Sequence, residues 1–135
     1  MKPIFNNILT LCLFSVLILP LQAMPDQIGT WEKLGSRKVN FKTDRDEILV
    51  TRRDGRFRKI KLEVDKGSVN FHECIVVFGD GRRQNVKMKK VIHEGQSTRV
   101  IDLQGGGRII NKVIFVYDTH DYESKKAKVT LRGLH

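Results

Sequence analysis

Cysteine is scarce in this chain of 135 residues, which contains only Cys12 and Cys74. Cys12 lies in an apolar run at the N-terminus, so the rest of the chain keeps one thiol and cannot form an intrachain disulfide. Small exported domains often rely on disulfides for their stability. Here that source is excluded, and the fold must be stabilised by apolar packing. We expect Cys74, within an apolar-rich run, to be a buried and inert thiol.

Helical periodicity is also missing. From residue 24 to residue 135, no segment repeats apolar residues at helical spacing over several turns. Short apolar runs instead alternate with turn-forming residues at intervals of about ten positions. This pattern excludes a helical bundle and predicts an all-β fold: a single antiparallel β-sandwich, jelly-roll-like, with about eight or nine strands.

Long hydrophobic runs are absent except at the N-terminus. Lys2 is followed by an apolar run from 8 to 19 and then by Ala23, the order that is typical of a secretory signal peptide. The run is about 12 residues long, whereas a membrane-spanning helix needs about 20. We therefore expect a cleavable signal peptide at 1–23, a single domain at 24–135, and a periplasmic or secreted protein. The alternative is a retained membrane anchor.

Two runs rich in β-branched residues, 98–103 and 108–117, flank the glycines at 105–107. β-branched residues favour strands, and a short glycine-containing loop between two such runs is typical of a hairpin. Both alternate sets of residues in the second run are apolar. A strand that is apolar on both faces belongs in the middle of a sheet, so we expect 108–117 to be a central strand.

The run 69–78 is a second candidate for a central strand. Alternate residues of a strand point to opposite faces of the sheet. Strict alternation gives this strand two apolar faces, one with Val69, Phe71, Ile75 and Val77 and the other with Cys74, Val76 and Phe78.

Turn signals separate the other runs. Asp54-Gly55 and Asp80-Gly81 are dipeptides that favour tight hairpin turns. The charged segment 43–47 predicts a turn before a strand at 48–51.

Regular alternation predicts two further strands. In 56–64, Ile60 lies on the inward set, and Phe57 falls out of phase with it, so we expect an irregularity near Arg58. Residues 126–132 alternate without interruption, which predicts a half-buried strand.

His72 and Cys74 are the first candidates for chemistry, because alternate residues of a strand share a face. A thiolate beside an imidazole is a nucleophile or half of a metal site, and it offers an alternative function as a small hydrolase or a metal-binding protein. Catalysis also needs an orienting group and oxyanion donors, and a metal needs two further ligands. The sequence identifies none of these. We therefore expect a protein that is not an enzyme.

Other potential ligand sites have simpler interpretations. The acidic clusters at 44–47 and 118–123 do not follow the spacing of a calcium-binding loop, and turn formation explains their aspartates. The glycines before Arg108 are not followed by a helix that could bind phosphate at its N-terminus. We expect no metal and no cofactor.

Acidic residues are few relative to basic ones: 15 against 25, which gives a formal net charge of +10. A basic exported domain attracts anionic envelope polymers and lipid headgroups. The best candidates are Arg82 and Arg83 in a predicted hairpin turn, with Lys87 and Lys89 on the strand that follows. Predicted outward cations also include Lys59 and Lys61 on one strand and Lys126, Lys128 and Arg132 on another.

The arrangement of these cations leaves two interpretations open. If the strands are neighbours, their charges form one binding face, and if the strands are dispersed, the charges only keep the protein soluble. No aromatic residues are clearly interleaved with the cations, so nucleic acid is not an expected partner. We expect a monomer, with a non-catalytic binding or structural role in the envelope.

Several short motifs resemble a known family. They are Leu34-Gly35, Ile60-Lys61-Leu62, Glu94-Gly95-Gln96-Ser97-Thr98-Arg99, Ile101-Asp102-Leu103, and Arg108 ahead of Lys112-Val113-Ile114-Phe115. With the signal peptide, they are similar to the YaaI-like family of small exported bacterial proteins of unknown function. The resemblance implies a compact β domain in the envelope and assigns no activity to any residue. Some members carry a cysteine pair where this chain has Asp54 and Ile109, so no disulfide is carried over.

Overall fold

The computed structural model describes residues 29–39, 45–119 and 127–135, and the predicted signal peptide at 1–23 lies outside these ranges. Within them the chain forms nine strands, all paired antiparallel, and a single 3-10 turn, η2 (Arg52–Asp54). This part of the chain contains no helix that could span a bilayer. The strands are β1 (Glu32–Lys38), β2 (Arg45–Leu49), β3 (Arg56–Phe57), β4 (Lys59–Asp65), β5 (Val69–Phe78), β6 (Arg83–Ile92), β7 (Ile101–Asp102), β8 (Arg108–Asp118) and β9 (Lys128–Leu134).

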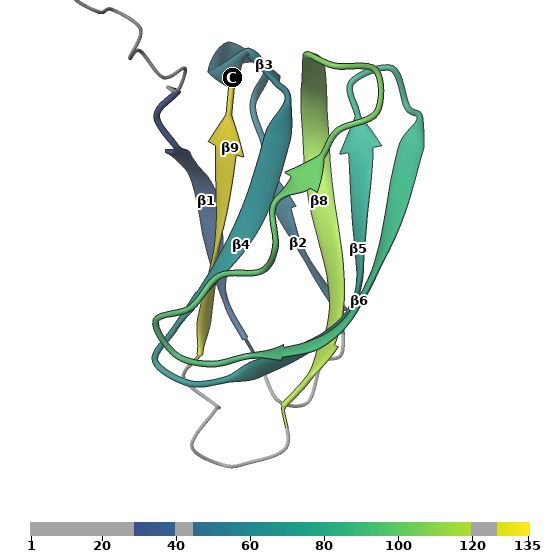
Figure 1. Ribbon diagram of the computed structural model, residues 1–135. Helices are drawn as coiled ribbons and strands as arrows, with labels where there is room; N and C mark the ends of the chain where they lie inside the picture. Colours follow the sequence, from purple (N-terminus) through teal and green to yellow (C-terminus); the bar gives the residue numbers. More distant parts are fainter. Residues whose placement is uncertain (1–28, 40–44, 120–126) are drawn as a thin grey trace, which may run out of the picture.

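The strands form two sheets, which confirms the predicted β-sandwich (Figure 1). The first sheet has the order β1-β9-β4-β7, and the second has the order β2-β8-β5-β6, with β3 also paired to β8. We call them the β4–β9 sheet and the β5–β8 sheet. The chain crosses repeatedly from one sheet to the other, and the interleaved order is that of a jelly roll. The predicted central strands, β5 and β8, are both interior strands of their sheet.

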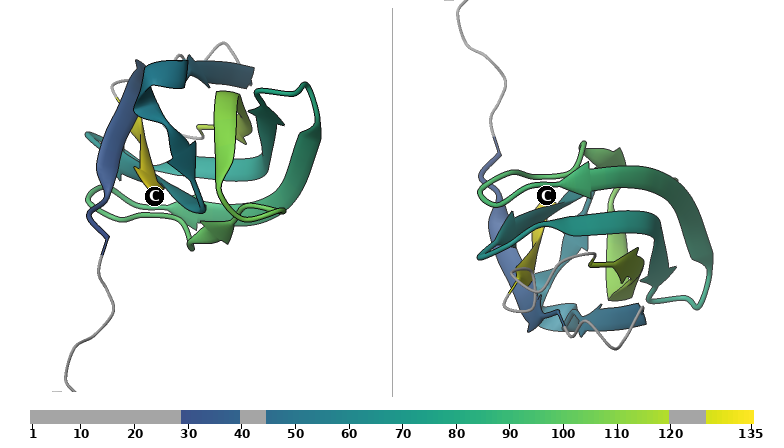
Figure 2. Two further views of the ribbon diagram at one scale, coloured as in Figure 1. Left: turned by 90° about the horizontal axis from the view of Figure 1, so that it is seen from above. Right: turned by 90° about the horizontal axis from the view of Figure 1, so that it is seen from below.

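The core fills the space between the two sheets, which enclose it in both end-on views of Figure 2. Alternation along β4 and β9 supplies one wall, as predicted for half-buried strands. The other wall is rich in aromatic residues because β5 and β8 are apolar on their inner faces. The largest fully buried side chains are Tyr117, Phe57, Phe71, Phe78, Phe115, Ile60, Leu62, Ile110 and Leu131.

The predicted hairpin between 98–103 and 108–117 is wrong. β7 pairs with β4, where Ile101 lies opposite Ile60, while β8 pairs with β2 and β5 in the other sheet. The glycine loop therefore carries the chain across the sandwich. Gly105 and Gly106 have positive φ values of 88° and 78°, which residues with a Cβ rarely adopt.

The predicted hairpin at Asp54-Gly55 is also wrong, and so is the turn predicted over the charged segment at 45–47. Arg45–Leu49 is β2, and both β2 and β3 pair with β8, so the chain continues along one edge of β8 rather than folding back. η2 interrupts this edge. The predicted irregularity near Arg58 is confirmed, because it lies where the chain leaves β3 for β4 in the opposite sheet.

The predicted faces of β5 are wrong beyond Phe71. The pairing of β5 with both neighbours shifts between Phe71 and Glu73, which places a β-bulge at His72. An extra residue moves every later side chain to the opposite face. Cys74, Val76 and Phe78 therefore join Val69 and Phe71 in the main core, while Ile75 and Val77 form a separate outer cluster with Ile114.

Candidate anion-binding surface

The four predicted anion-binding residues lie together along the edge of the β5–β8 sheet. Arg82 is in the turn between β5 and β6, whereas Arg83, Lys87 and Lys89 are on β6, the last strand of the sheet. All four side chains are exposed. We call this set the β6 rim.

A tight turn presents the two arginines. Gly81 has a φ of 89°, the backbone N–H of Phe78 donates to Arg82 O at 2.8 Å, and that of Arg82 donates to Asp80 Oδ1 at 3.0 Å. These bonds confirm the hairpin predicted at Asp80-Gly81. A second local irregularity presents Lys89, which has a φ of 42° beside the β-bulge.

Side chains partly cover the hydrogen-bonding edge of β6. Gln84 Nε2 donates to Asp102 O at 2.9 Å, and Gln84 Oε1 accepts from Gln104 N–H at 2.8 Å, so this residue links β6 to the segment around β7. Arg99 Nη2 donates to Lys87 O at 3.2 Å. Side chains that cross an edge and cap one of its carbonyls make that edge a poorer template for another strand. Its charged side chains are therefore what it presents to a partner.

Few counter-charges lie against the β6 rim. Among the residues that the structure describes, Arg83, Lys87 and Lys89 form no ion pair, and Arg82 forms a long one, 3.9 Å from Nε to Asp80 Oδ2. Glu73 lies opposite Lys87 in the strand register without a recorded ion pair. The rim thus presents a row of cations whose charge is not neutralised by close contacts.

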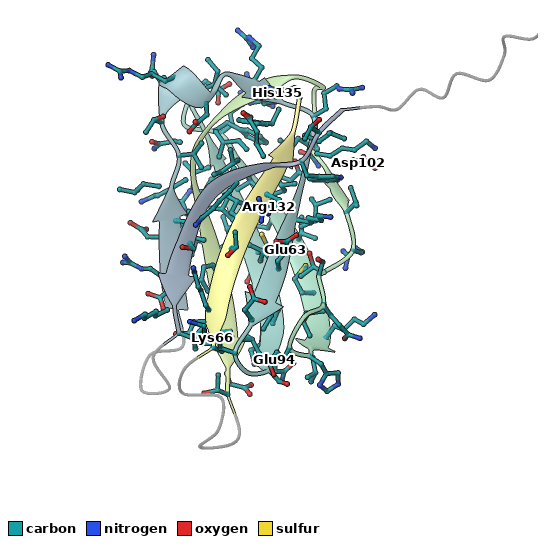
Figure 3. The ribbon with its side chains drawn as sticks, turned by 90° about the vertical axis from the view of Figure 1, so that its left-hand side faces the viewer. Glu63, Lys66, Glu94, Asp102, Arg132 and His135 are labelled. Atoms are coloured by element: carbon teal, nitrogen blue, oxygen red, sulfur yellow. The ribbon has the colours of Figure 1, made fainter. Side chains whose placement is uncertain are left out.

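The cations of the β4–β9 sheet lie on a different face (Figure 3). Arg132 and Glu63 lie side by side near the middle of this face, with 2.9 Å between Nε and Oε1. Lys59 Nζ lies 2.6 Å from Asp102 Oδ1, and Lys61 Nζ lies 4.5 Å from the centre of the Trp31 ring. The predicted basic strands therefore fall into two groups. Lys128 belongs to this face, and Lys126 lies outside the described residues.

The structure separates His72 from Cys74. The β-bulge leaves His72 exposed, whereas Cys74 is fully buried in the core. Burial raises the pKa of the Cys74 thiol to about 12, so the thiolate is not available near neutral pH. The predicted burial of Cys74 is confirmed, and His72 and Cys74 do not form the shared site on which the alternative function depended.

His72 has another partner instead. Its Nε2 pairs with Asp118 Oδ2, which also accepts a hydrogen bond from Asn70 Nδ2 at 3.2 Å. Of the acidic clusters, Asp44, Asp121 and Glu123 lie outside the described residues. Within the described part of the chain, no group of histidine, cysteine, aspartate and glutamate residues has the geometry of a metal site.

Sequence reasoning missed a hollow at the end of the sandwich that carries η2. Arg52, Arg56 and Arg108 line it together with Asp80. The sequence contained a signal in the run of arginines from 52 to 58, but nothing local placed Arg108 beside it.

Comparison with known proteins identifies a structure of similar fold and a family to which the sequence matches. No functionally curated protein matches the chain. One solved structure, the AlgX protein of Pseudomonas aeruginosa, superimposes with a TM-score of 0.54 at 16% sequence identity. The superposition covers 75% of this chain but 26% of AlgX, so this chain spans about a quarter of that protein, and at this identity the likeness shows the fold alone.

A family model described as a domain of unknown function, DUF2541, matches residues 9–133. The description does not test the YaaI-like resemblance. Because the match extends over nearly the whole sequence, the chain belongs to the DUF2541 family.

Proposed function

We propose that this protein is an exported, non-catalytic domain that binds an anionic polymer of the cell envelope through the β6 rim. The observation that carries the proposal is the difference in charge pairing between the two groups of cations. Those at the centre of the β4–β9 face have a carboxylate or a ring beside them. The cations of the β6 rim have no close counter-charge within the described part of the chain and can therefore contact an anionic ligand.

The spacing of the rim suits a linear ligand. A strand rises by about 3.3 Å per residue, so Arg83 and Lys87 lie about 13 Å apart along β6. Each exposed contact contributes less than about 1 kcal/mol, and salt screens it within about 10 Å. Several contacts to one polymer act together, so we expect binding that weakens steeply as salt increases.

Two further parts of the proposal rest on separate observations. Export rests on the order of basic, apolar and small residues before position 24. A non-catalytic role rests on the burial of Cys74, the nucleophile candidate that sequence reasoning had singled out.

The binding test compares two variants of equal charge. In one, Arg82, Arg83, Lys87 and Lys89 are changed to glutamine. In the control, Lys33, Lys38, Lys66 and Lys128 are changed to glutamine, because none of these has a recorded ion-pair partner within the described residues. Binding to lipopolysaccharide is measured across a salt series, with anionic vesicles and DNA as comparison ligands.

We expect the rim variant to lose most of the lipopolysaccharide binding and the control to lose much less. Equal losses would show that net charge alone matters. An absence of binding by the unmodified protein at low salt would leave solubility as the role of the cations.

Thiol labelling tests the non-catalytic part. Cys74 in the folded protein should react far more slowly with a thiol reagent than in the unfolded protein, because the thiol is buried. Fast labelling with a depressed pKa would instead favour an enzyme. For export, N-terminal sequencing of the protein from the envelope fraction should begin at Met24, and an intact Met1 would contradict cleavage.

A further inference from the structure

A hollow of about 320 Å³ opens between η2, β3, the start of β8 and the turn after β5. These elements meet at the upper end of the sandwich in Figure 1, near the C-terminus. We call this hollow the arginine hollow. Its lining is Arg52, Arg56, Phe78, Gly79, Asp80, Arg108 and Ile109.

Arg108 is held in place before any ligand arrives. Its side chain is 19% exposed, and its guanidinium lies over the Phe78 ring, 3.8 Å from the ring centre. Nη1 donates to Gln104 O at 2.8 Å, and Nη2 donates to Asp80 Oδ2 at 3.1 Å. A stacked, hydrogen-bonded guanidinium loses little entropy when an anion binds, so this side chain is preorganised.

The other two arginines are less constrained. Arg56 Nη1 donates to Gly107 O at 3.2 Å, and both Arg56 and Arg52 are exposed. The backbone below Arg52 is nevertheless fixed, since Thr51 N–H and Oγ1 both donate to Asp54 Oδ2, at 3.1 and 3.0 Å. These two exposed guanidiniums lie within reach of a ligand that binds to Arg108.

The charge of the hollow is unbalanced. Three arginines and one aspartate line it, which leaves two positive charges. Asp80 is already engaged by the backbone N–H of Arg82 and by Arg108, and these interactions hold the pKa of its carboxyl below its usual value. Asp80 therefore stays ionised at neutral pH and offsets one of the three positive charges.

We propose that the arginine hollow binds a terminal phosphate monoester carried on a larger molecule. A phosphate monoester has a charge of about −1.5 to −2 at pH 7, which matches the unbalanced charge of the hollow. Its oxygens also match the forked N–H donors of arginine. A carboxylate or a phosphate diester carries a single charge and leaves one arginine without a counter-charge.

The floor of the hollow explains why the phosphate has a carrier. Ile109 is half-buried and adds apolar surface beside the guanidiniums, while Phe78 lies beneath Arg108, and the hollow is larger than a phosphate group alone requires. The carrier, a sugar or a lipid glycerol, packs its carbon atoms against this floor. The proposal is independent of polymer binding at the β6 rim, because the lining residues and the kind of ligand both differ.

The test uses glucose 6-phosphate as the probe and calorimetry of the purified protein as the measurement. Arg52 and Arg56 are changed together to glutamine, and the double variant Arg53→Gln, Lys66→Gln is the charge-matched control, since both residues are exposed and neither lines the hollow. We expect the first double variant to lose about tenfold or more in affinity, as for the removal of charged hydrogen bonds, and the control less than about twofold. No binding by the unmodified protein, or equal losses in both variants, would overturn the proposal.

Asp80→Asn provides a variant whose expected effect is a gain. Removing this carboxylate frees Arg108 Nη2 and raises the positive charge of the hollow, while the amide oxygen can still accept from Arg82 N–H. Affinity for glucose 6-phosphate should rise several-fold, a result that misfolding cannot produce. An unchanged or lower affinity in a folded variant would contradict the role of Asp80.

Three comparisons define the ligand and its source. Glucuronate and glycerophosphoglycerol should bind more weakly than glucose 6-phosphate, and equal binding would overturn the preference for a monoester. Phosphatidic acid in phosphatidylcholine vesicles tests a lipid source: binding that depends on Arg52 and Arg56 supports a headgroup, and none supports a soluble phosphate. The variant lacking the four rim cations should retain glucose 6-phosphate binding, so the two proposals fail separately.

Discussion

The outer faces of the two sheets carry charge in different ways. On the β4–β9 face, cations in the middle of the sheet have partners, as Arg132 does in Glu63 and Lys59 does in Asp102. On the β5–β8 face the middle is apolar, with Ile75, Val77 and Ile114 at most 7% exposed. Beside this centre Lys112 pairs with Glu47 at 3.2 Å, and Arg83, Lys87 and Lys89 lie at the β6 rim without an ion pair among the described residues.

This difference implies that separate parts of the β5–β8 face contribute to stability and to the binding of anions. Exposed ion pairs contribute little to stability, whereas a buried apolar side chain contributes about 1.5–3 kcal/mol. The β5–β8 face is therefore expected to stabilise the fold through its centre and to attract anions at its edge. The β4–β9 face neutralises most of its own charge and does neither strongly.

The largest expected effect is on stability. Ile114→Ala removes apolar contacts from the outer cluster and should lower the free energy of unfolding by about 2–5 kcal/mol. Glu63→Gln on the other face should lower it by less than about 1 kcal/mol, because the ion pair is partly exposed. Urea denaturation of the two variants measures both values. Equal losses would mean that the two faces do not differ in this way.

The second prediction places a negative charge among the cations of the β6 rim. Asn85 is exposed on β6 between Arg83 and Lys87, on the same side of the strand. Asn85→Glu should weaken lipopolysaccharide binding several-fold and change stability by less than about 0.5 kcal/mol. Asn85→Gln is the control for size. If both variants bind alike, charge on the rim is not what the ligand contacts.

The third prediction converts the neutralised face into a basic one. The double variant Glu63→Gln, Asp102→Asn removes the partners of Arg132 and Lys59. The freed cations should add about one unit each to the slope of log affinity against log salt for a polyanion. An unchanged slope would indicate that these ion pairs do not limit the binding of a polyanion to this face.

The smallest expected effect is a pH-dependent change in stability at His135. His135, after β9, pairs through Nδ1 with Arg56 O at 2.7 Å and through Nε2 with Glu32 Oε2 at 2.6 Å. The carbonyl, and then Glu32, raises the pKa of His135 above 6.5, because both bonds require the protonated ring to donate. The resulting stability is fully present below the unfolded pKa and is lost as pH rises through the higher folded pKa.

Glu32→Gln should therefore destabilise the protein at pH 6 by less than about 1 kcal/mol, given the exposure of the pair, and have no effect at pH 9. Urea denaturation at the two pH values measures this difference. A loss that is the same at both would show that titration of His135 is not involved.

The sequence by itself determined the fold class and much of the strand pattern. Alternation predicted the buried faces of β4 and β9, in which Ile60, Leu62, Val129 and Leu131 are fully buried. Local chemistry also predicted the Asp80-Gly81 turn and the break near Arg58. These features depend on residues that are neighbours in the chain, so a short window of sequence contains the information.

For the candidate sites, the sequence identified the cations of the β6 rim but neither their lack of partners nor the arginine hollow. Glu63 neutralises Arg132 across a sequence separation of 69 residues, and Asp80 meets Arg108 across 28. Pairings of this kind follow from the order of the strands, which no local pattern encodes.

Tertiary structure also decided the path of the glycine loop and the faces of β5, because both depend on which strands pair. The glycines at 105–107 suit a hairpin or a crossover equally well, and the crossover occurs because β7 pairs with β4 rather than with β8. The bulge at His72 likewise depends on the register with two neighbouring strands, and it placed Cys74 in the core and His72 at the surface. Alternation states which residues share a face only while the register is unbroken, and the packing of the whole sandwich sets that register.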